Sequence, residues 1–152
     1  MKATLPIVLL TLTVHVALGQ SDGLRRQHYN LKKNIALEGY DVVSYFDGTP
    51  KLGDPQIKWV YKSVTYLFTS SASLAKFRLN PDKYEPEYGG WCAYAMGDNG
   101  DKVKVDPETF KILNGKLYLF YNFWGSNTLE DWEKNEKKLK ESADQNWKNL
   151  VR

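Results

Sequence analysis

Cys92 is the only cysteine in a chain of 152 residues, and its thiol is the side chain best suited to unusual chemistry. A thiolate is a soft ligand that favours Cu(I) or zinc. A tight metal site needs three or four ligands, and His28 is the only histidine beyond the first nineteen residues that can assist. Free cysteine is also among the most buried residue types, and an odd cysteine in a secreted protein can pair between chains. We favour a buried, inert thiol and keep Cys92 as the one metal-ligand candidate.

Nucleophilic catalysis would require Cys92 or a serine to be activated by His28. That histidine lies in a polar N-terminal segment, and the chain contains no Gly-x-Ser-x-Gly turn. The sequence therefore predicts no acyl-transfer site.

The acidic residues offer two further kinds of chemistry. Asp82, Glu85 and Glu87 flank a tyrosine-rich stretch, and paired carboxylates are the groups that glycosidases use. Nothing in the sequence places them across a cleft. The run 98–101, Asp-Asn-Gly-Asp, has oxygen ligands near a glycine but lacks the twelve-residue calcium loop and its closing Glu, so we interpret it as a solvated turn. No catalytic residues are assigned, and we predict a protein that is not an enzyme.

Aromatic residues could instead line a small-ligand pocket, and no cofactor-binding residue is assigned. The chain holds five Trp, ten Tyr and six Phe, most of which must be buried, so packing in the core is the favoured role. The Gly89-Gly90 pair lacks the length and the lysine of a phosphate loop and is expected to let the backbone turn or pass close to another group. The pocket candidates are Tyr40, Tyr45, Tyr84, Tyr88, Trp91 and Tyr94.

The first nineteen residues have the three parts of a secretory signal peptide. Lys2 is the positive start, Leu5 to Leu12 is the apolar run, and Ala17 and Gly19 are the small residues before the cleavage point. We predict cleavage between Gly19 and Gln20, with an uncleaved membrane anchor as the alternative. No second long apolar stretch follows, so we expect a secreted, extracellular, soluble chain without stable membrane insertion.

Composition limits the remaining classes of protein. Hydrophobic residues make up 42% and charged residues 26%, which is typical of one globular domain. The net charge of +3 is too small to indicate a nucleic-acid partner. One cysteine excludes an intrachain disulfide. We find no internal repeat and no low-complexity segment.

The strand patterns predict an antiparallel sheet. Alternating residues predict strands over 41–46, 56–61 and 64–69, the last two joined by a two-residue turn at Lys62-Ser63. Asn114-Gly115 lies between two β-prone runs and predicts a type I′ hairpin.

The helix patterns predict one short central helix and one long C-terminal helix. Ser70, Ser71 and Ser73 are candidate N-caps for a helix through Leu79, which ends at Asn80-Pro81. Residues 128–131 have capping-box form and open the long helix. One stripe along it is apolar and predicts docking on the domain, through Trp132, Leu139, Ala143, Trp147 and Leu150.

Several of these segments together resemble the secreted YHS-domain family. They are the run 39–46 (GYDVVSYF), the middle 77–95 with Asn80-Pro81-Asp82-Lys83-Tyr84 and Gly89-Gly90-Trp91-Cys92, and the closing hairpin 106–122. The resemblance spans roughly residues 35–150 as one α+β domain, after a signal peptide at 1–19 and a polar segment at 20–34 that we interpret as an N-terminal tail or a short helix leading into the domain.

The resemblance implies only a modest function. YHS domains are found in copper-transporting ATPases and phenol hydroxylases, and their metal-binding relatives use several cysteines, whereas this chain has one. We therefore expect no cofactor, and only the resemblance offers copper or zinc as an alternative. We expect a non-enzymatic module that binds a small ligand, a metal or an extracellular protein, with a structural component of an extracellular matrix as the alternative.

Overall fold

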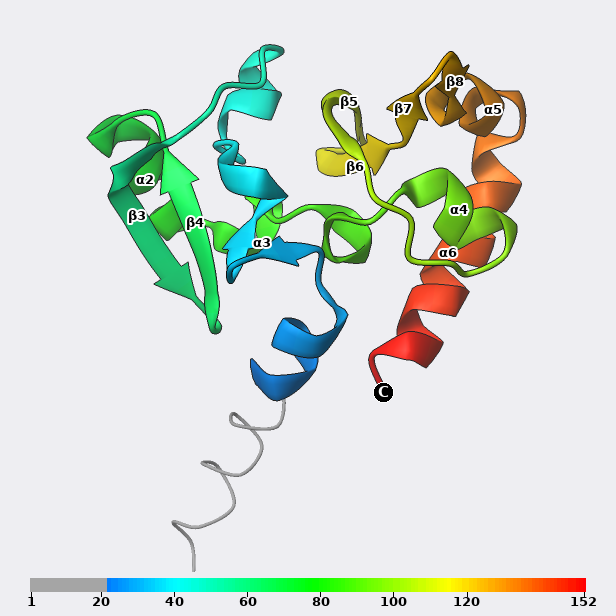
Figure 1. The fold of residues 1–152 in the computed structure, drawn as a ribbon, viewed down its shortest axis with the longest axis horizontal. Helices are drawn as coiled ribbons and strands as arrows, with labels where there is room; N and C mark the ends of the chain where they lie inside the picture. The colour runs from blue at the N-terminus through cyan, green and yellow to red at the C-terminus, as the bar shows by residue number, and fades with distance from the viewer. Residues whose placement is uncertain (1–21) are drawn as a thin grey trace, which may run out of the picture.

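The computed structural model describes residues 22–152. The predicted signal segment and its cleavage point between Gly19 and Gln20 lie outside the described residues. The described part opens with a helix over residues 22–28, and Figure 1 shows it beside the C-terminal end of the chain.

A four-stranded sheet forms the first half of the molecule, in the order β1-β2-β4-β3. Its strands are β1 (Leu31–Lys32), β2 (Ile35–Ala36), β3 (Asp54–Tyr61) and β4 (Val64–Phe68). Two 3₁₀ turns precede β3, namely η1 (Leu37–Gly39) and η2 (Ser44–Asp47), and two helices follow β4, namely α2 (Ser71–Leu79) and α3 (Pro81–Tyr84). Strands β3 and β4 form the predicted hairpin, with positive φ at both Lys62 and Ser63.

The second half is built on the predicted Asn-Gly hairpin, β5 (Asp106–Leu113) with β6 (Lys116–Phe120). The turn η3 (Glu87–Gly90) and the helix α4 (Ala93–Asp98) precede it. A small hairpin, β7 (Asn122–Phe123) with β8 (Ser126–Asn127), then leads into α5 (Thr128–Lys134) and α6 (Glu136–Leu150). In Figure 1 the two halves lie side by side, with α6 along the outer edge of the second.

The two large hairpins have the same design. Each pairs an eight-residue strand with a five-residue strand across a two-residue turn. Each has a register shift just after its first residue, between Asp54 and Lys58 in one and between Asp106 and Phe110 in the other. Both begin with Asp-Pro and end with Tyr-Leu-Phe. The hairpins are therefore equivalent at an offset of 52 residues in the sequence.

The equivalence extends to the segments before the hairpins. Ile35 bridges Thr65 in parallel, and Pro86 bridges Leu117 in the same way. A left-handed turn follows each bridge, with three consecutive positive φ values at 37–39 and again at 88–90. These segments place one polar side chain at the same point of each half, Asp41 in the first and Cys92 in the second.

The helices after the hairpins are equivalent as well. Phe77 of α2 packs on Tyr66 and Phe68, and Trp132 of α5 packs on Tyr118 and Phe120. Each helix ends at an asparagine with extended φ, Asn80 or Asn135, and a new helix begins directly after it. We call residues 35–80 the first unit and residues 86–135 the second unit.

The expectation of no internal repeat is therefore wrong at the level of structure. The repeat is hidden because few residue types are shared, and because the two units differ by insertions before and after the hairpin. Two buried clusters follow the same division, one centred on Phe77 and one on Trp132, although Cys92, Leu117 and Leu119 belong to the first.

The predicted fold class is confirmed as a small α+β fold with a long C-terminal helix. Three local predictions are wrong. Residues 41–46 are not a strand, because the Asp41 carboxylate accepts the amide of Val43 and the chain turns into η2. The predicted helix from Thr128 is two helices, because Asn135 breaks it. The side chain of Asn127, not the predicted capping box, caps α5 by accepting the amide of Leu129.

Candidate functional site

Cys92 is fully buried at the start of α4. Its Sγ lies 3.4 Å from the Tyr121 amide nitrogen, which donates to it, and 3.4 Å from Thr128 Oγ1. Because Thr128 Oγ1 already donates to the carbonyl of Tyr121, the thiol is the donor to Thr128. Among residues 22–152 no group of three or more His, Cys, Asp and Glu side chains is arranged to hold a metal ion.

His28 is engaged away from Cys92. Its Nδ1 lies 3.0 Å from Lys102 Nζ, and its carbonyl accepts the indole N–H of Trp91 at 2.6 Å. Burial, and then the charge of Lys102, lowers the pKa of His28. Within the described residues no hydrogen bond joins this imidazole to a thiol or a hydroxyl, so the geometry assembles no nucleophile and base.

The three candidate acids are each committed to a partner. Glu85 forms an ion pair with Arg25, Glu87 lies 3.4 Å from Lys116 Nζ, and Asp82 lies 3.3 Å from Lys62 Nζ. The hydrogen bond from Tyr61, assisted by Lys62, lowers the pKa of Asp82. The predicted turn over residues 98–101 is at the end of α4, where Asn99 Oδ1 accepts the amide of Asp101.

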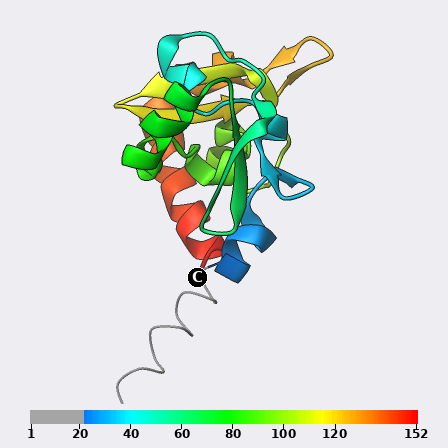
Figure 2. The ribbon, with the colours of Figure 1, turned by 90° about the vertical axis from the view of Figure 1, so that its left-hand side faces the viewer.

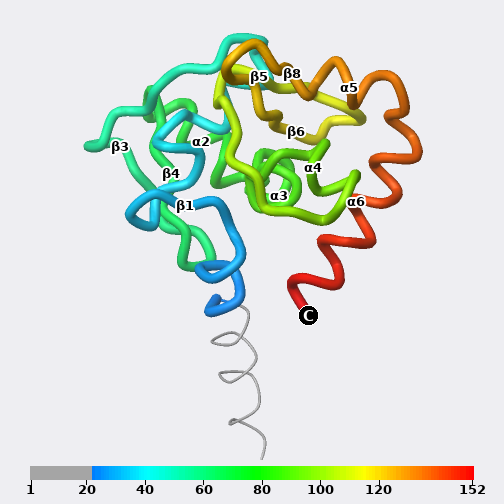
Figure 3. The backbone as a smooth tube through the Cα atoms, turned by 45° about the vertical axis from the view of Figure 1, so that its right-hand side comes forward, coloured from blue at the N-terminus to red at the C-terminus, as the bar shows by residue number. Residues whose placement is uncertain are grey.

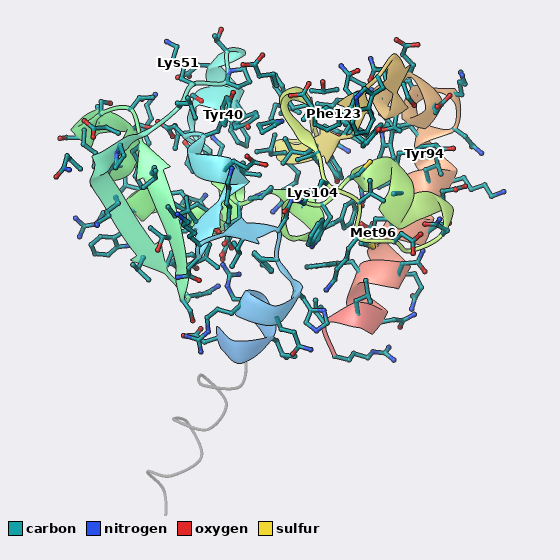
Figure 4. The ribbon with its side chains drawn as sticks, in the orientation of Figure 1. Tyr40, Lys51, Tyr94, Met96, Lys104 and Phe123 are labelled. Carbon is teal, nitrogen blue, oxygen red and sulfur yellow. The ribbon has the colours of Figure 1, made fainter. Side chains whose placement is uncertain are left out.

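The six candidate aromatics do not gather in one pocket. Tyr45 and Tyr84 are buried in the first cluster, and Tyr88 is buried in the second, where its hydroxyl donates to Asp144. Tyr40 donates to Glu108. Figure 4 shows Tyr94 and Met96 on α4, on the side of α6, far from Tyr40. These residues pack the fold, and only Tyr88 borders the groove described next.

Arg25 clamps the N-terminal helix to the rest of the molecule. Its guanidinium pairs with both oxygens of Glu85, donates to the Tyr29 hydroxyl at 2.7 Å and donates to the Lys62 carbonyl at 3.0 Å. Tyr66 also donates to Glu85. Burial alone would lower the pKa of Arg25, but the hydrogen bond and charge of Glu85 raise it. Burial, assisted by the charge of Glu85, raises the pKa of Tyr29 to about 12.

This clamp holds Tyr29 against Trp147 of α6. The two rings have centroids 5.9 Å apart and are tilted by 53°. Gly89 lies beneath them with φ +60°, and a Cβ at this position would lie 2.9 Å from atoms of both rings. The backbone of Gly89 is fixed because its carbonyl accepts the amide of Asn30 at 2.9 Å. The expectation that the Gly89-Gly90 pair allows a close approach is confirmed at Gly89.

Two hollows flank this aromatic pair, and we call them together the Tyr29–Trp147 groove. The first has a volume of about 290 Å³ and combines an apolar lining with Arg25 and Lys62. The second has a volume of about 210 Å³ and is lined by carboxylates, the backbone of η3 and Lys116. Figure 3 shows the helix at 22–28 and the end of α6 next to each other. The residues that line the first hollow come mainly from these two segments. The first hollow is lined by Leu24, Arg25, Tyr29, Lys62, Trp147 and Val151.

A third hollow, of about 180 Å³, lies over Asp41 and is strongly polar. The Asp41 carboxylate is fully buried and accepts from the amides of Val43 and Thr69 and from the hydroxyls of Thr69 and Ser73. Since these four donors satisfy the carboxylate, its role is to join the segment before η2 to the start of α2.

The sequence did not predict the groove. Tyr29 lies in the segment taken as a polar tail, and Trp147 was expected only as a helix anchor. The pairing of Arg25 with Glu85 spans 60 residues, so no local sequence pattern indicates it. The one available signal was Gly89. The sequence predicted that another group comes close to this glycine, but it did not identify that group as the two aromatic rings.

No helix within residues 22–152 combines the length and the apolar character needed to cross a bilayer. Comparison of the chain with protein-family models, curated proteins and solved structures gave no match.

Proposed function

We propose that this protein is a secreted, non-enzymatic binding module of YHS type that holds a small amphipathic anion in the Tyr29–Trp147 groove. The observation that carries the proposal is the pair of hollows that meet at the Tyr29 and Trp147 rings, over a glycine that leaves room for both. Ligand sites are concave and mostly apolar, with a few polar groups that orient the ligand.

The first hollow sets the chemistry of the ligand. Leu24, Val151 and the two rings offer an apolar surface for an aliphatic or aromatic body. Arg25 has its donors engaged by Glu85, Tyr29 and Lys62, so it shapes the wall without being free to bind. The side chain of Lys62 is about half exposed; its ammonium pairs with the exposed carboxylate of Asp82 and lies 4.8 Å from the centre of the Tyr61 ring. Lys62 is therefore the group that would receive an anionic end of the ligand.

The size of the hollow limits the ligand. A volume of about 290 Å³ is at the lower end of the range for small-molecule sites, roughly 300–1,000 Å³. The best match is a compact molecule with one or two rings or a short chain, and one acidic group. The second hollow is lined by Asp82, Glu85 and Glu87, so it would repel a second anionic group.

The proposal is tested with 8-anilinonaphthalene-1-sulfonate, a probe with an apolar body and one sulfonate. We expect binding at one site per chain, weakened at least tenfold by Val151→Asp and about threefold to tenfold by Lys62→Gln. Lys140→Gln, on the charged face of α6, is the matched control and should bind as the parent protein does. Binding at several sites, or equal binding by Val151→Asp and the control, would contradict the proposal.

A further inference from the structure

The second unit carries a hairpin that the first unit lacks. In the first unit Thr69 is followed directly by Ser70, the N-cap of α2. In the second unit, five residues separate Tyr121, the equivalent of Thr69, from Asn127, the N-cap of α5. They form β7, the turn and the first residue of β8. Figure 2 shows this hairpin projecting from the rest of the fold. It is therefore an addition to a framework that is complete without it.

Trp124 occupies the apex of this hairpin in an unfavourable conformation. Trp124 and Gly125 form its two-residue turn, with φ values of +52° and +81°. This turn type favours Asn-Gly, which the β5–β6 hairpin uses at Asn114-Gly115. A bulky residue with positive φ is a genuine outlier. Strain of this kind is held where the surroundings or a function require it.

The Trp124 indole is almost fully exposed, and the Phe123 ring beside it is partly exposed. Trp124 is 95% exposed and Phe123 is 39% exposed. The Phe123 ring lies 6.0 Å from the Trp124 ring and 5.1 Å from the Tyr121 ring, measured between centroids. The hairpin thus presents two aromatic side chains to the outside at the cost of local strain.

The segment is also free of charge. No charged residue lies between Lys116 and Glu130, although charged residues make up 26% of the chain. The nearest charge joined to the hairpin is the carboxylate of Glu130, which accepts from the Asn127 side chain. An uncharged aromatic apex can be buried in an apolar environment without the cost of desolvating an ion. The carboxylate at its base would be repelled by an anionic surface.

We propose that the Phe123–Trp124 apex inserts into the interfacial region of a zwitterionic lipid surface. Trp is enriched at membrane interfaces because one end of the indole is apolar and the other end is wet. A projecting tip reaches a lipid surface without help from the surrounding protein surface. A protein partner would require a matched area of about 800 Å² on this side, which two aromatic side chains do not supply. Two inserted rings should give weak, reversible binding, with an association constant not above that of a single acyl chain, on the order of 10⁴ M⁻¹.

The test is sedimentation of the purified protein with large vesicles of phosphatidylcholine. We expect the parent protein to partition onto them, and Trp124→Asn to lose binding at least tenfold. This variant creates the favoured Asn-Gly turn, so its thermal midpoint should not fall. Trp59→Thr removes a 39% exposed tryptophan from β3 in the other unit, and it is the matched control that should bind as the parent does.

Three results would overturn the proposal. They are the absence of parent binding to phosphatidylcholine vesicles, an equal loss of binding in Trp124→Asn and Trp59→Thr, and binding that appears only when anionic lipid is added. Capture of a protein partner through Trp124, without vesicle binding, would likewise replace the lipid assignment. None of these results depends on the Tyr29–Trp147 groove.

Discussion

Asp41 and Cys92 stand at the same place in the two units, yet one is a carboxylate and the other is a thiol. Each lies after a left-handed turn, accepts the amide that follows the second hairpin strand, and contacts a hydroxyl from the first turn of the next helix. The amides of Asp41 and Cys92 also donate to equivalent carbonyls, those of Lys51 and Val103. The comparison shows that this position joins the hairpin to its helix and that two different polar groups can do so.

The units differ where features have been added. The second unit has the hairpin at 122–127, and after Asn135 it continues into the fifteen-residue helix α6, whereas the first continues after Asn80 into the four-residue helix α3. Trp147 of the groove and Trp124 of the apex both lie in these additions. We infer that the shared framework positions Lys62 and Gly89 at the groove, and that binding also needs the aromatic residues that the additions supply.

The largest effects should come from the aromatic residue that each helix places on its hairpin. Phe77 and Trp132 are both fully buried. Phe77→Ala and Trp132→Ala should each lower the free energy of unfolding by about 3–5 kcal/mol. Urea unfolding measures this, and Lys140→Ala, which removes only a surface pair with Asp144, should change it by less than about 0.5 kcal/mol. A small loss of unfolding free energy in either aromatic variant would contradict the equivalence of the two units.

Asp41 and Cys92 should differ in their contribution to stability. Asp41→Ala leaves two amides and two hydroxyls without their acceptor, and should cost about 3 kcal/mol. Cys92→Ala removes one sulfur atom that makes two long contacts, and should cost about 1 kcal/mol. Denaturation midpoints of the two variants give the comparison, and a larger loss in Cys92→Ala would contradict it.

High pH should weaken the clamp between the N-terminal helix and the first unit. Burial raises the pKa of Tyr29 to about 12, and burial raises that of Tyr66 as well. A raised tyrosine pKa stabilises the folded state fully below about pH 10, and this stabilisation is lost as pH rises toward 12. For Tyr29 the loss is about 2 kcal/mol. Tyr29→Phe should therefore show a smaller decrease in stability between pH 10 and 12 than the parent, and an unchanged decrease would rule out the clamp as its source.

Substitution of Trp124 should change stability by a small amount and in the opposite direction. Trp124→Asn relieves the strain of a bulky residue with positive φ and loses no buried surface, so the free energy of unfolding should rise by about 1 kcal/mol. Thermal unfolding measures the change. A clear loss of stability would mean that the indole supports the fold.

The hairpins and their turns could be predicted from the sequence because their signals are local. Lys62-Ser63 and Asn114-Gly115 lie between β-prone runs, and Ser70 caps α2 as predicted by accepting the amide of Ser73. The break between the two C-terminal helices at Asn135 could not be predicted, because the apolar stripe continues past this residue at helical spacing.

The groove depends on contacts that no local pattern contains. Arg25 meets Glu85 across 60 residues, and Tyr29 meets Trp147 from opposite ends of the described chain. The repeat was missed for a related reason. What the units share is register, backbone conformation and ring stacking, whereas the residue types at Asp41 and Cys92, or at Phe77 and Trp132, differ.

The central claim is that ligand binding occurs at the Tyr29–Trp147 groove and not at the polar hollow over Asp41, and amide chemical shifts test it most directly. In a titration of the ¹⁵N-labelled protein with 8-anilinonaphthalene-1-sulfonate, we expect the shifted amides to cluster at residues 24–29, 62, 89 and 147–151. The amides of Asp41, Thr69 and Ser73 around the polar hollow should stay unchanged. Shifts centred on that polar hollow, or on Trp124 at the hairpin apex, would contradict the account.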